Sequence, residues 1–196
     1  MPMQKHLFLT GPAGCGKSEA IRNTLGPALL SAGGFVTLPE RDEDTYLCRC
    51  SLLPAAAAGG AEGFEAHTYL DLTRLPLWHD NEVFRTEGVR LLQEAAWYPF
   101  SVLDAIGGFE LLIPQFRAAL ADTLSSDQPL LCVLMARKEA EALCRRLGLG
   151  ERVQANIAQL WKVLQADPDS LIVELSGLHR RKALRALEQW AEEYAR

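Results

Sequence analysis

An eight-residue stretch near the start of the chain constrains the fold more than any other feature of the sequence. Residues 11–18 read Gly-Pro-Ala-Gly-Cys-Gly-Lys-Ser, which fits the pattern G-x-x-x-x-G-K-[S/T] of a phosphate-binding loop, also called Walker A. Residues 5–10 form a short apolar run that suits a buried strand, and residues 18–25 carry apolar side chains at helical spacing. The pattern is informative only between a strand and a helix, and here it has both neighbours. The sequence therefore predicts a strand, a phosphate-binding loop and a helix in succession.

The composition of this loop suits a triphosphate. Its glycines let the backbone wrap a phosphate without side-chain clashes, and its amides open a helix whose dipole favours anions. Pro12 has no amide and donates nothing. We expect Lys17 to reach the β and γ phosphates and the Ser18 hydroxyl to hold Mg²⁺. The predicted nucleotide-binding residues are Gly11, Pro12, Ala13, Gly14, Cys15, Gly16, Lys17 and Ser18.

A second anchor is predicted at Asp104. Residues 100–104, Phe-Ser-Val-Leu-Asp, form a short apolar run that ends in an acid, as in the Walker B pattern. In that pattern the carboxylate holds Mg²⁺ through water, at the end of a strand beside the P-loop strand. Many strands end in Asp, but the P-loop in the same chain makes Asp104 the best candidate. The predicted metal site therefore consists of Ser18 and Asp104.

Elsewhere, continuous apolar runs alternate with amphipathic stretches. Residues 129–135 and 171–175 suit buried strands, whereas residues 151–165 and 184–194 place apolar side chains on helical stripes. This alternation predicts an α/β fold, the three-layer P-loop NTPase fold, with a mostly parallel central sheet and helices on both faces. Ligands of such sheets bind at the carboxyl ends of the strands, where the loop and Asp104 would both lie. The length of 196 residues predicts a single domain over 1–196.

Proline and glycine mark several boundaries along the chain. Gly26-Pro27 predicts a break near Leu25, followed by a second helical piece that Gly33-Gly34 ends. Residues 72–79 are expected to form a loop, and residues 83–96 follow a helical period. A further helix is expected to start near Pro114.

Residues from about 44 to 70 are predicted to form a hairpin insert at the edge of the sheet. Residues 45–53 are rich in strand formers, and residues 64–70 can return as a partner strand. Between them, residues 54–63 are mostly alanine and glycine without an apolar period, which predicts a flexible loop. We expect the hairpin to stand off the main sheet, either as a cover over the nucleotide or as a decorative edge.

Composition narrows the possible partners and the compartment. The formal charge of −5 argues against general nucleic-acid binding. The sequence contains no run of 18 apolar residues, so no membrane span is expected. The first residues lack a signal-peptide layout. The five cysteines are an odd number without C-x-x-C spacing, which fits reduced thiols, and Cys48 and Cys50 would share one face of a strand. We therefore expect a cytoplasmic protein; no protein partner is indicated.

Four stretches, taken together, resemble one family. Residues 8–11 lead into the P-loop near the N-terminus, and residues 33–37 (G-G-F-V-T) are followed by Glu40-Arg41. Residues 103–111 read L-D-A-I-G-G-F-E-L, and Phe116-Arg117 precedes the apolar strand at 129–131. In this order and spacing the chain resembles the small P-loop nucleoside-triphosphatase family, which includes thermophilic archaeal and bacterial enzymes and the human cancer-related nucleoside-triphosphatase. The resemblance implies an ATPase-type fold and Mg²⁺-dependent hydrolysis of ATP, GTP and other nucleoside triphosphates, with broad base tolerance.

One departure from the family bears on catalysis. The family has Glu directly after the Walker B Asp, where this chain has Ala105. That Glu is the usual candidate for polarising the attacking water, and alanine cannot accept a proton. Loss of such a group typically costs about 10²–10⁴-fold in rate, so hydrolysis is expected to be weak unless another carboxylate serves. Glu110, the second acid of the motif, is our substitute candidate; its alternative role is a helix-start acid that complements the dipole.

A basic cluster at residues 179–182 is the third candidate feature. It lies at the beginning of the last predicted helix, where cations oppose the dipole, so it needs an anionic partner. The family carries an Asn-Arg pair after the last strand, and His179-Arg180 matches its place. The resemblance implies that Arg180, or its neighbour Arg181, contacts the nucleotide or the charge of the transition state. The alternative is a solvated basic turn that pairs with surface acids.

Three functions remain open from the sequence. The first is a nucleoside triphosphatase with Lys17, Glu110 and Arg180 as catalytic residues. The second is a P-loop kinase that passes the γ-phosphate to a small acceptor, with Arg41 and Arg49 available to contribute. The third is a nucleotide-dependent regulatory module that lost hydrolysis through Ala105.

Overall fold

The computed structural model describes residues 4–41 and 48–195. Their centre is one eight-stranded sheet with the strand order β5-β4-β3-β2-β6-β7-β1-β8. The pairings that join β2, β6, β7, β1 and β8 are all parallel, whereas β3, β4 and β5 extend one edge in antiparallel pairings. The strands are β1 (His6–Thr10), β2 (Ala32–Arg41), β3 (Cys48–Pro54), β4 (His67–Asp71), β5 (Trp78–His79), β6 (Phe100–Ile106), β7 (Leu130–Leu134) and β8 (Ser170–Glu174). The predicted mostly parallel sheet is confirmed.

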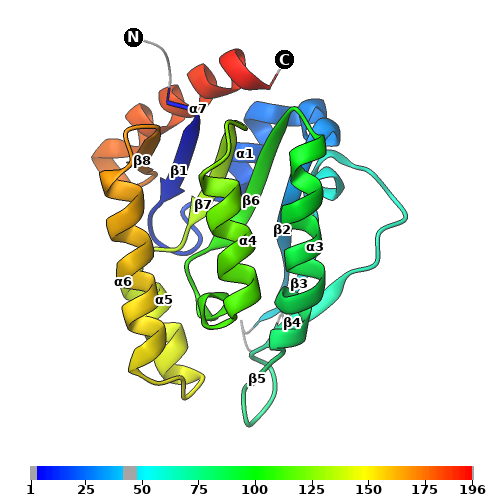
Figure 1. Cartoon of the computed structure of the whole chain (residues 1–196), viewed down its shortest axis with the longest axis vertical. Helices are drawn as coiled ribbons and strands as arrows, with labels where there is room; N and C mark the ends of the chain where they lie inside the picture. The colour runs from blue at the N-terminus through cyan, green and yellow to red at the C-terminus, as the bar shows by residue number, and fades with distance from the viewer. Residues whose placement is uncertain (1–3, 42–47, 196) are drawn as a thin grey trace.

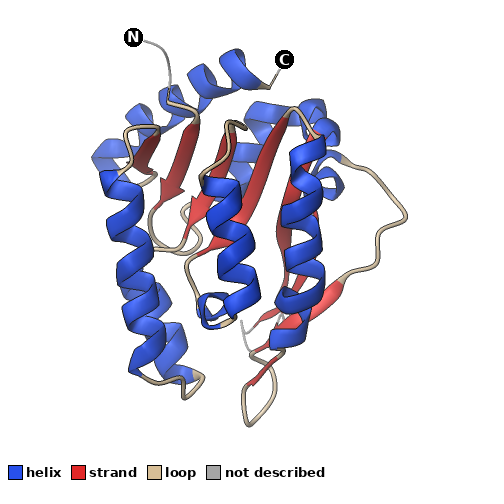
Figure 2. Cartoon of the chain, in the orientation of Figure 1, coloured by secondary structure: helices blue, strands red, loops and turns tan. Residues whose placement is uncertain are grey.

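Helices cover both faces of this sheet (Figures 1 and 2). In Figure 1, α3, α4, α5 and α6 lie in front of the strands, and α1 and α7 lie behind them. The helices are α1 (Lys17–Leu25), α2 (Asn81–Val83), α3 (Val89–Glu94), α4 (Pro114–Leu124), α5 (Arg137–Arg146), α6 (Glu151–Ala166) and α7 (Arg180–Tyr194). The three-layer α/β architecture is therefore confirmed.

Alternation along the strands divides the core into two parts. In β1, Leu7 and Leu9 join the core under α1 and α7, while Phe8 faces the core under α4 and α6. All three side chains are fully buried. Because successive side chains of a strand point to opposite faces, a strand buried on both sides must be apolar at every position. This explains the continuous apolar runs of the sequence.

The segment after α1 confirms one prediction and corrects another. The helix ends at Leu25, and Gly26-Pro27 begins a short 3-10 helix, η1 (Gly26–Ser31), as expected for proline after a helix. The glycine pair at 33–34 was expected to end that helix, but it lies inside β2. Gly34 has φ +86, and a Cβ there would lie 2.4 Å from the Val102 carbonyl oxygen of β6. Only glycine therefore allows β2 and β6 to approach this closely.

The edge hairpin is more closely built into the sheet than expected. β3 pairs with β2 over the length of the strand, from Phe35↔Pro54 to Arg41↔Cys48, so the hairpin continues the sheet rather than standing off it. The expectation of a flexible loop is also wrong at its start, because η2 (Ala55–Gly59) is a 3-10 helix with Ala55 fully buried. The expected start near residue 44 lies outside the described residues.

Three smaller points complete the chain. Residues 72–79, expected as a loop, include the short strand β5, and the helix expected at 83–96 is interrupted by a π-helical turn, η3 (Phe84–Gly88). The Cys48 and Cys50 sulfur atoms lie 3.7 Å apart on one face of β3, and no disulfide forms among the five cysteines. Within residues 4–41 and 48–195, no helix is long and apolar enough to cross a membrane.

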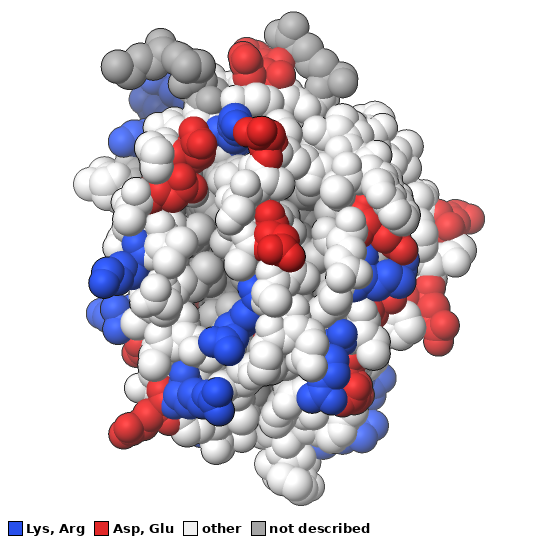
Figure 3. Space-filling view, in the orientation of Figure 1, with Lys and Arg blue, Asp and Glu red and all other residues white. Residues whose placement is uncertain are grey.

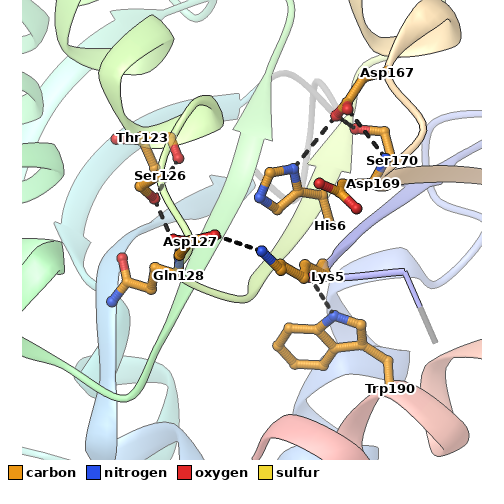
Figure 4. Close-up of polar contacts among 10 residues, drawn as sticks. All are labelled: Lys5, His6, Thr123, Ser126, Asp127, Gln128, Asp167, Asp169, Ser170 and Trp190. Carbon is orange, nitrogen blue, oxygen red and sulfur yellow. Dashed lines mark hydrogen bonds and ion pairs between the residues drawn. The ribbon is translucent and has the colours of Figure 1, made fainter. Parts of the chain in front are cut away.

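The amino-terminal edge of the sheet is tied together by polar contacts (Figure 4). The Trp190 indole of α7 donates to the Lys5 carbonyl at 2.8 Å, and Lys5 Nζ lies 2.6 Å from Asp127. A cavity of about 470 Å³ opens here between α4 and α6, visible as a hollow in Figure 3, with buried His6 among its lining residues. His6 is the first residue of β1, whereas the P-loop follows its last residue, Thr10. This cavity therefore lies at the amino-terminal ends of the strands, and the P-loop lies at their carboxyl ends.

Candidate nucleotide-binding site

The glycine spacing of the P-loop is explained by its backbone. The loop leaves β1 after Thr10 and enters α1 at Lys17. Its three glycines, Gly11, Gly14 and Gly16, have φ values of +137, +74 and +91. Residues with a Cβ rarely adopt this conformation, so the curve of the loop requires glycine at these positions. The loop therefore has the strand and helix neighbours that the sequence predicts.

Lys17 places its charge at the centre of this curve. Its Nζ donates to the carbonyl oxygens of Gly11 at 2.7 Å and of Pro12 at 2.9 Å. An ammonium group has three donors, and all of them can be exchanged for phosphate oxygens without moving the helix that carries the side chain. The loop thus brings a cation and a helix N-terminus to one point, which is the electrostatic requirement for binding an anion.

Ser18 and Asp104 meet across the carboxyl edge of the sheet. Ser18 and Asp104 line the same cavity, and Asp104 is only 6% exposed. Burial raises the pKa of the Asp104 carboxyl, and hydrogen bonding from the Ser18 hydroxyl partly opposes that rise. The positive charges of Arg22 and Lys17 oppose it as well. A hydroxyl and a carboxylate are hard oxygen donors, and a nearly buried carboxylate gains from a cation, so these two residues fit Mg²⁺.

The strand order corrects one detail of the Walker B prediction. Asp104 was expected on the strand next to the P-loop strand, but β7 lies between β1 and β6. Ser18 and Asp104 nevertheless line one cavity of about 130 Å³, together with Thr37 of β2. The segment that follows β7 therefore emerges between the two anchors of the site.

In the turn after β6, the Glu110 carboxylate is buried and bonded to backbone amides. Ala105 is partly exposed and offers only a methyl group. Glu110 is buried, and its Oε1 accepts hydrogen bonds from the amides of Gly107 at 2.6 Å and Gly108 at 2.8 Å. Burial raises the pKa of the Glu110 carboxyl, and these amides offset part of the rise. In this conformation Glu110 shapes its own turn; its use as a base stays a prediction.

Arg180 reaches the P-loop from the start of α7. It is the first residue of α7, and its Nη1 donates to the Cys15 carbonyl at 2.9 Å. A Cβ on Gly16 would lie 3.8 Å from Nη2 of the same guanidinium. Arg181, the neighbouring candidate, is exposed. The structure thus brings the P-loop, Asp104 and Arg180 together at one edge of the sheet.

One contact was missed by the sequence reasoning. The Oε1 atom of Glu139, in the first turn of α5, accepts a hydrogen bond of 2.6 Å from the Ala13 amide of the P-loop. No motif marks this residue. The signal that could have found it is topological, because an acid in the first turn after β7 faces the loop only if β7 lies beside β1.

Comparison with known proteins agrees with this geometry. A profile of a protein family described as NTPase matches residues 6–162, which is most of the chain. The chain belongs to this NTPase family. Among solved structures, THEP1 from the hyperthermophile Aquifex aeolicus is similar, with a TM-score of 0.61 and 15% sequence identity over 92% of this chain and 95% of that chain. This likeness concerns the fold alone. No curated protein sequence matches the chain.

Membership of the NTPase family confirms the resemblance inferred from the four stretches, three of which carry parts of the site. The matched range includes the P-loop, Asp104 and Glu139, and ends before Arg180. The contact of Arg180 with the loop therefore belongs to the part of the chain that the profile does not reach.

Proposed function

We propose that this NTPase-family chain binds ATP, GTP or another nucleoside triphosphate with Mg²⁺ and hydrolyses it to the diphosphate and phosphate. The observation that carries this proposal is that Ser18 and Asp104 line one cavity beside a P-loop whose lysine bonds the Gly11 and Pro12 carbonyls. It joins a phosphate-binding element and a metal-binding pair in one site. Neither element alone distinguishes a triphosphate from other anions.

The residues of the site divide the work. The loop amides and Lys17 bind the β and γ phosphates, and Lys17 offsets the charge that develops on the leaving diphosphate. Ser18 and Asp104 would hold Mg²⁺, which would neutralise part of the negative charge of the phosphates. Arg180 has donors that could bind a phosphate, because a guanidinium has five N–H groups and its Nη1 bonds the Cys15 carbonyl.

The kinase alternative receives less support from the arrangement of arginines. Arg49, one of the two candidates for an acceptor site, lies 3.5 Å from Asp71 and 4.0 Å from Glu40. It is therefore engaged with acids of the edge strands. The side chain of Arg41, the other candidate, lies outside the described part of the structure. The regulatory-module alternative rests on Ala105, which supplies no base.

Phosphate release separates these functions. Purified protein is incubated with Mg²⁺ and ATP, GTP, CTP or UTP in turn, beside Lys17→Ala and the remote control Lys162→Ala on the exposed side of α6. We expect Lys17→Ala to lower kcat/KM by about 10²–10³-fold, as loss of one charge-stabilising donor typically does, and Lys162→Ala to match wild type. Tight binding without release above Lys17→Ala would contradict hydrolysis and support the regulatory module. Release only with an added acceptor would support the kinase.

A further inference from the structure

Glu139 touches the P-loop where a phosphate would be expected to bind. Its carboxylate accepts a 2.6 Å hydrogen bond from the Ala13 amide, two residues after Gly11 and four before Lys17. The loop amides are donors suited to anions, and a carboxylate is an anion. A triphosphate on this loop would therefore lie beside Glu139, and the two would compete for the same donor.

The fold holds Glu139 at this position. α5 begins three residues after the end of β7, and β7 lies between the P-loop strand β1 and the Asp104 strand β6. Ala140, the next residue along the helix, and Cys144 are fully buried, so the first turn of α5 is anchored in the core. The Glu139 amide donates to the Ala136 carbonyl at 2.9 Å, which closes that turn. The acid is thus supported by a rigid element, as a positioned catalytic group requires.

The other acids near the site are less suited to activating water. Glu110 is buried and bonded to the amides of its own turn. Glu174 at the end of β8 accepts a hydrogen bond from Ser176. Glu19 of α1 lies beside Gly16, where Arg180 also approaches the loop. Of these four acids, Glu139 is the one bonded to an amide of the loop's first half.

We propose that Glu139 is the general base that replaces the acid missing at Ala105; this inference rests on the proposed hydrolysis. Glu139 gives up the Ala13 amide to the triphosphate and accepts a proton from a water molecule. The water oxygen forms a bond to the γ-phosphorus, and the bond from that phosphorus to the β–γ bridging oxygen breaks. Its electron pair stays on the diphosphate, and the proton passes from Glu139 to solvent.

This role separates turnover from binding. Glu139→Gln keeps an oxygen that can accept from the Ala13 amide but cannot take a proton at neutral pH. It also removes a negative charge that repels the triphosphate. The variant should therefore bind the nucleotide as tightly as wild type or more tightly, while its turnover falls. A merely structural contact would leave kcat unchanged or would impair binding and turnover together.

The test compares Glu139→Gln with Glu141→Gln, a matched control on the same helix that pairs with Arg137 at 3.0 Å. Phosphate release at saturating Mg²⁺-ATP gives kcat, calorimetric titration with ATP gives Kd, and the melting temperature monitors folding. We expect Glu139→Gln to lower kcat by about 10²-fold or more without weakening Kd, and Glu141→Gln to match wild type. Wild-type or faster turnover by Glu139→Gln would overturn the assignment of Glu139 and leave the hydrolase standing. No release by wild type above Lys17→Ala would overturn both.

Discussion

The turn after β6 and the turn after β7 both face the P-loop, yet they contribute in opposite ways. The first carries the recognisable motif, and its Asp104 meets Ser18, but its remaining acid, Glu110, is bonded to the amides of Gly107 and Gly108. The second carries no motif, and its Glu139 contacts the loop directly. The place of an acid in a motif therefore does not determine which groups its carboxylate contacts. In our proposal, the first turn supplies the metal-binding carboxylate and the second supplies the general base.

The largest effect is expected when a carboxylate is restored after Asp104 in the first turn and the Glu139 carboxylate is removed from the second. In Glu139→Gln, the further change Ala105→Glu should raise kcat by about 10²-fold, because it returns a carboxylate to the position after Asp104. Ala105 is partly exposed, so a longer side chain has room to extend from β6. Phosphate release measures the effect, with Ala105→Gln in the same background as the matched control.

The same two substitutions test whether position 105 and Glu139 serve the same role. In the wild-type background Ala105→Glu should raise kcat less than in Glu139→Gln, because two bases serving one water are not additive. Equal gains in the two backgrounds would mean that Glu139 and position 105 act independently. That result would contradict the division of labour between the turns.

A smaller effect is expected at Arg180, which approaches the loop from a third direction. Arg180→Ala removes the 2.9 Å hydrogen bond to the Cys15 carbonyl and a cation beside Gly16. We expect kcat/KM to fall about tenfold, the scale of one charge-assisted hydrogen bond. Steady-state kinetics measure it, with Arg181→Ala as the exposed neighbour. An equal loss in both variants would assign the effect to the overall charge of the α7 N-terminus rather than to the contact.

The smallest effect on turnover is expected at Glu110, where stability should change instead. Glu110→Ala leaves two buried amides without an acceptor and should lower the free energy of unfolding by about 1–3 kcal/mol. Glu110→Gln keeps an accepting oxygen and should retain kcat. Denaturant unfolding and phosphate release measure the two quantities. A large loss of kcat in Glu110→Gln, at unchanged stability, would indicate that Glu110 rather than Glu139 is the general base.

The raised pKa of Glu110 adds a pH signature to that comparison. Between the ordinary glutamate pKa and the raised value, Glu110 binds more protons in the folded state than in the unfolded state, so its contribution to wild-type stability falls as pH rises through this window. Glu110→Gln lacks this titration. Its free energy of unfolding, relative to wild type, should therefore increase over the same window and stay constant above it.

Much of this molecule could be predicted from local pattern. The P-loop, the break at Gly26-Pro27 and the helix that begins at Pro114 follow from rules that act within a few residues. The two-sided burial of β1 likewise follows from its continuous apolar run. These features need no knowledge of which segments become neighbours.

The errors occurred where distant segments meet. Gly33-Gly34 marks the close approach of β2 and β6 rather than the end of a helix. The strand β7 separates β1 from β6, and that insertion brings Glu139 to the loop. Strand order thus decides which acids lie near the loop.

Phosphorus NMR of the wild-type protein with Mg²⁺-ATP tests the central claim most directly. The spectrum follows each phosphate, so it distinguishes binding, hydrolysis and transfer to an acceptor in one experiment. We predict that the ATP signals are replaced by those of ADP and orthophosphate in equal amounts, and that Lys17→Ala retains nearly all of its ATP over the same time. ATP that binds the wild-type protein and persists, or that decays equally with Lys17→Ala, would contradict hydrolysis at this P-loop.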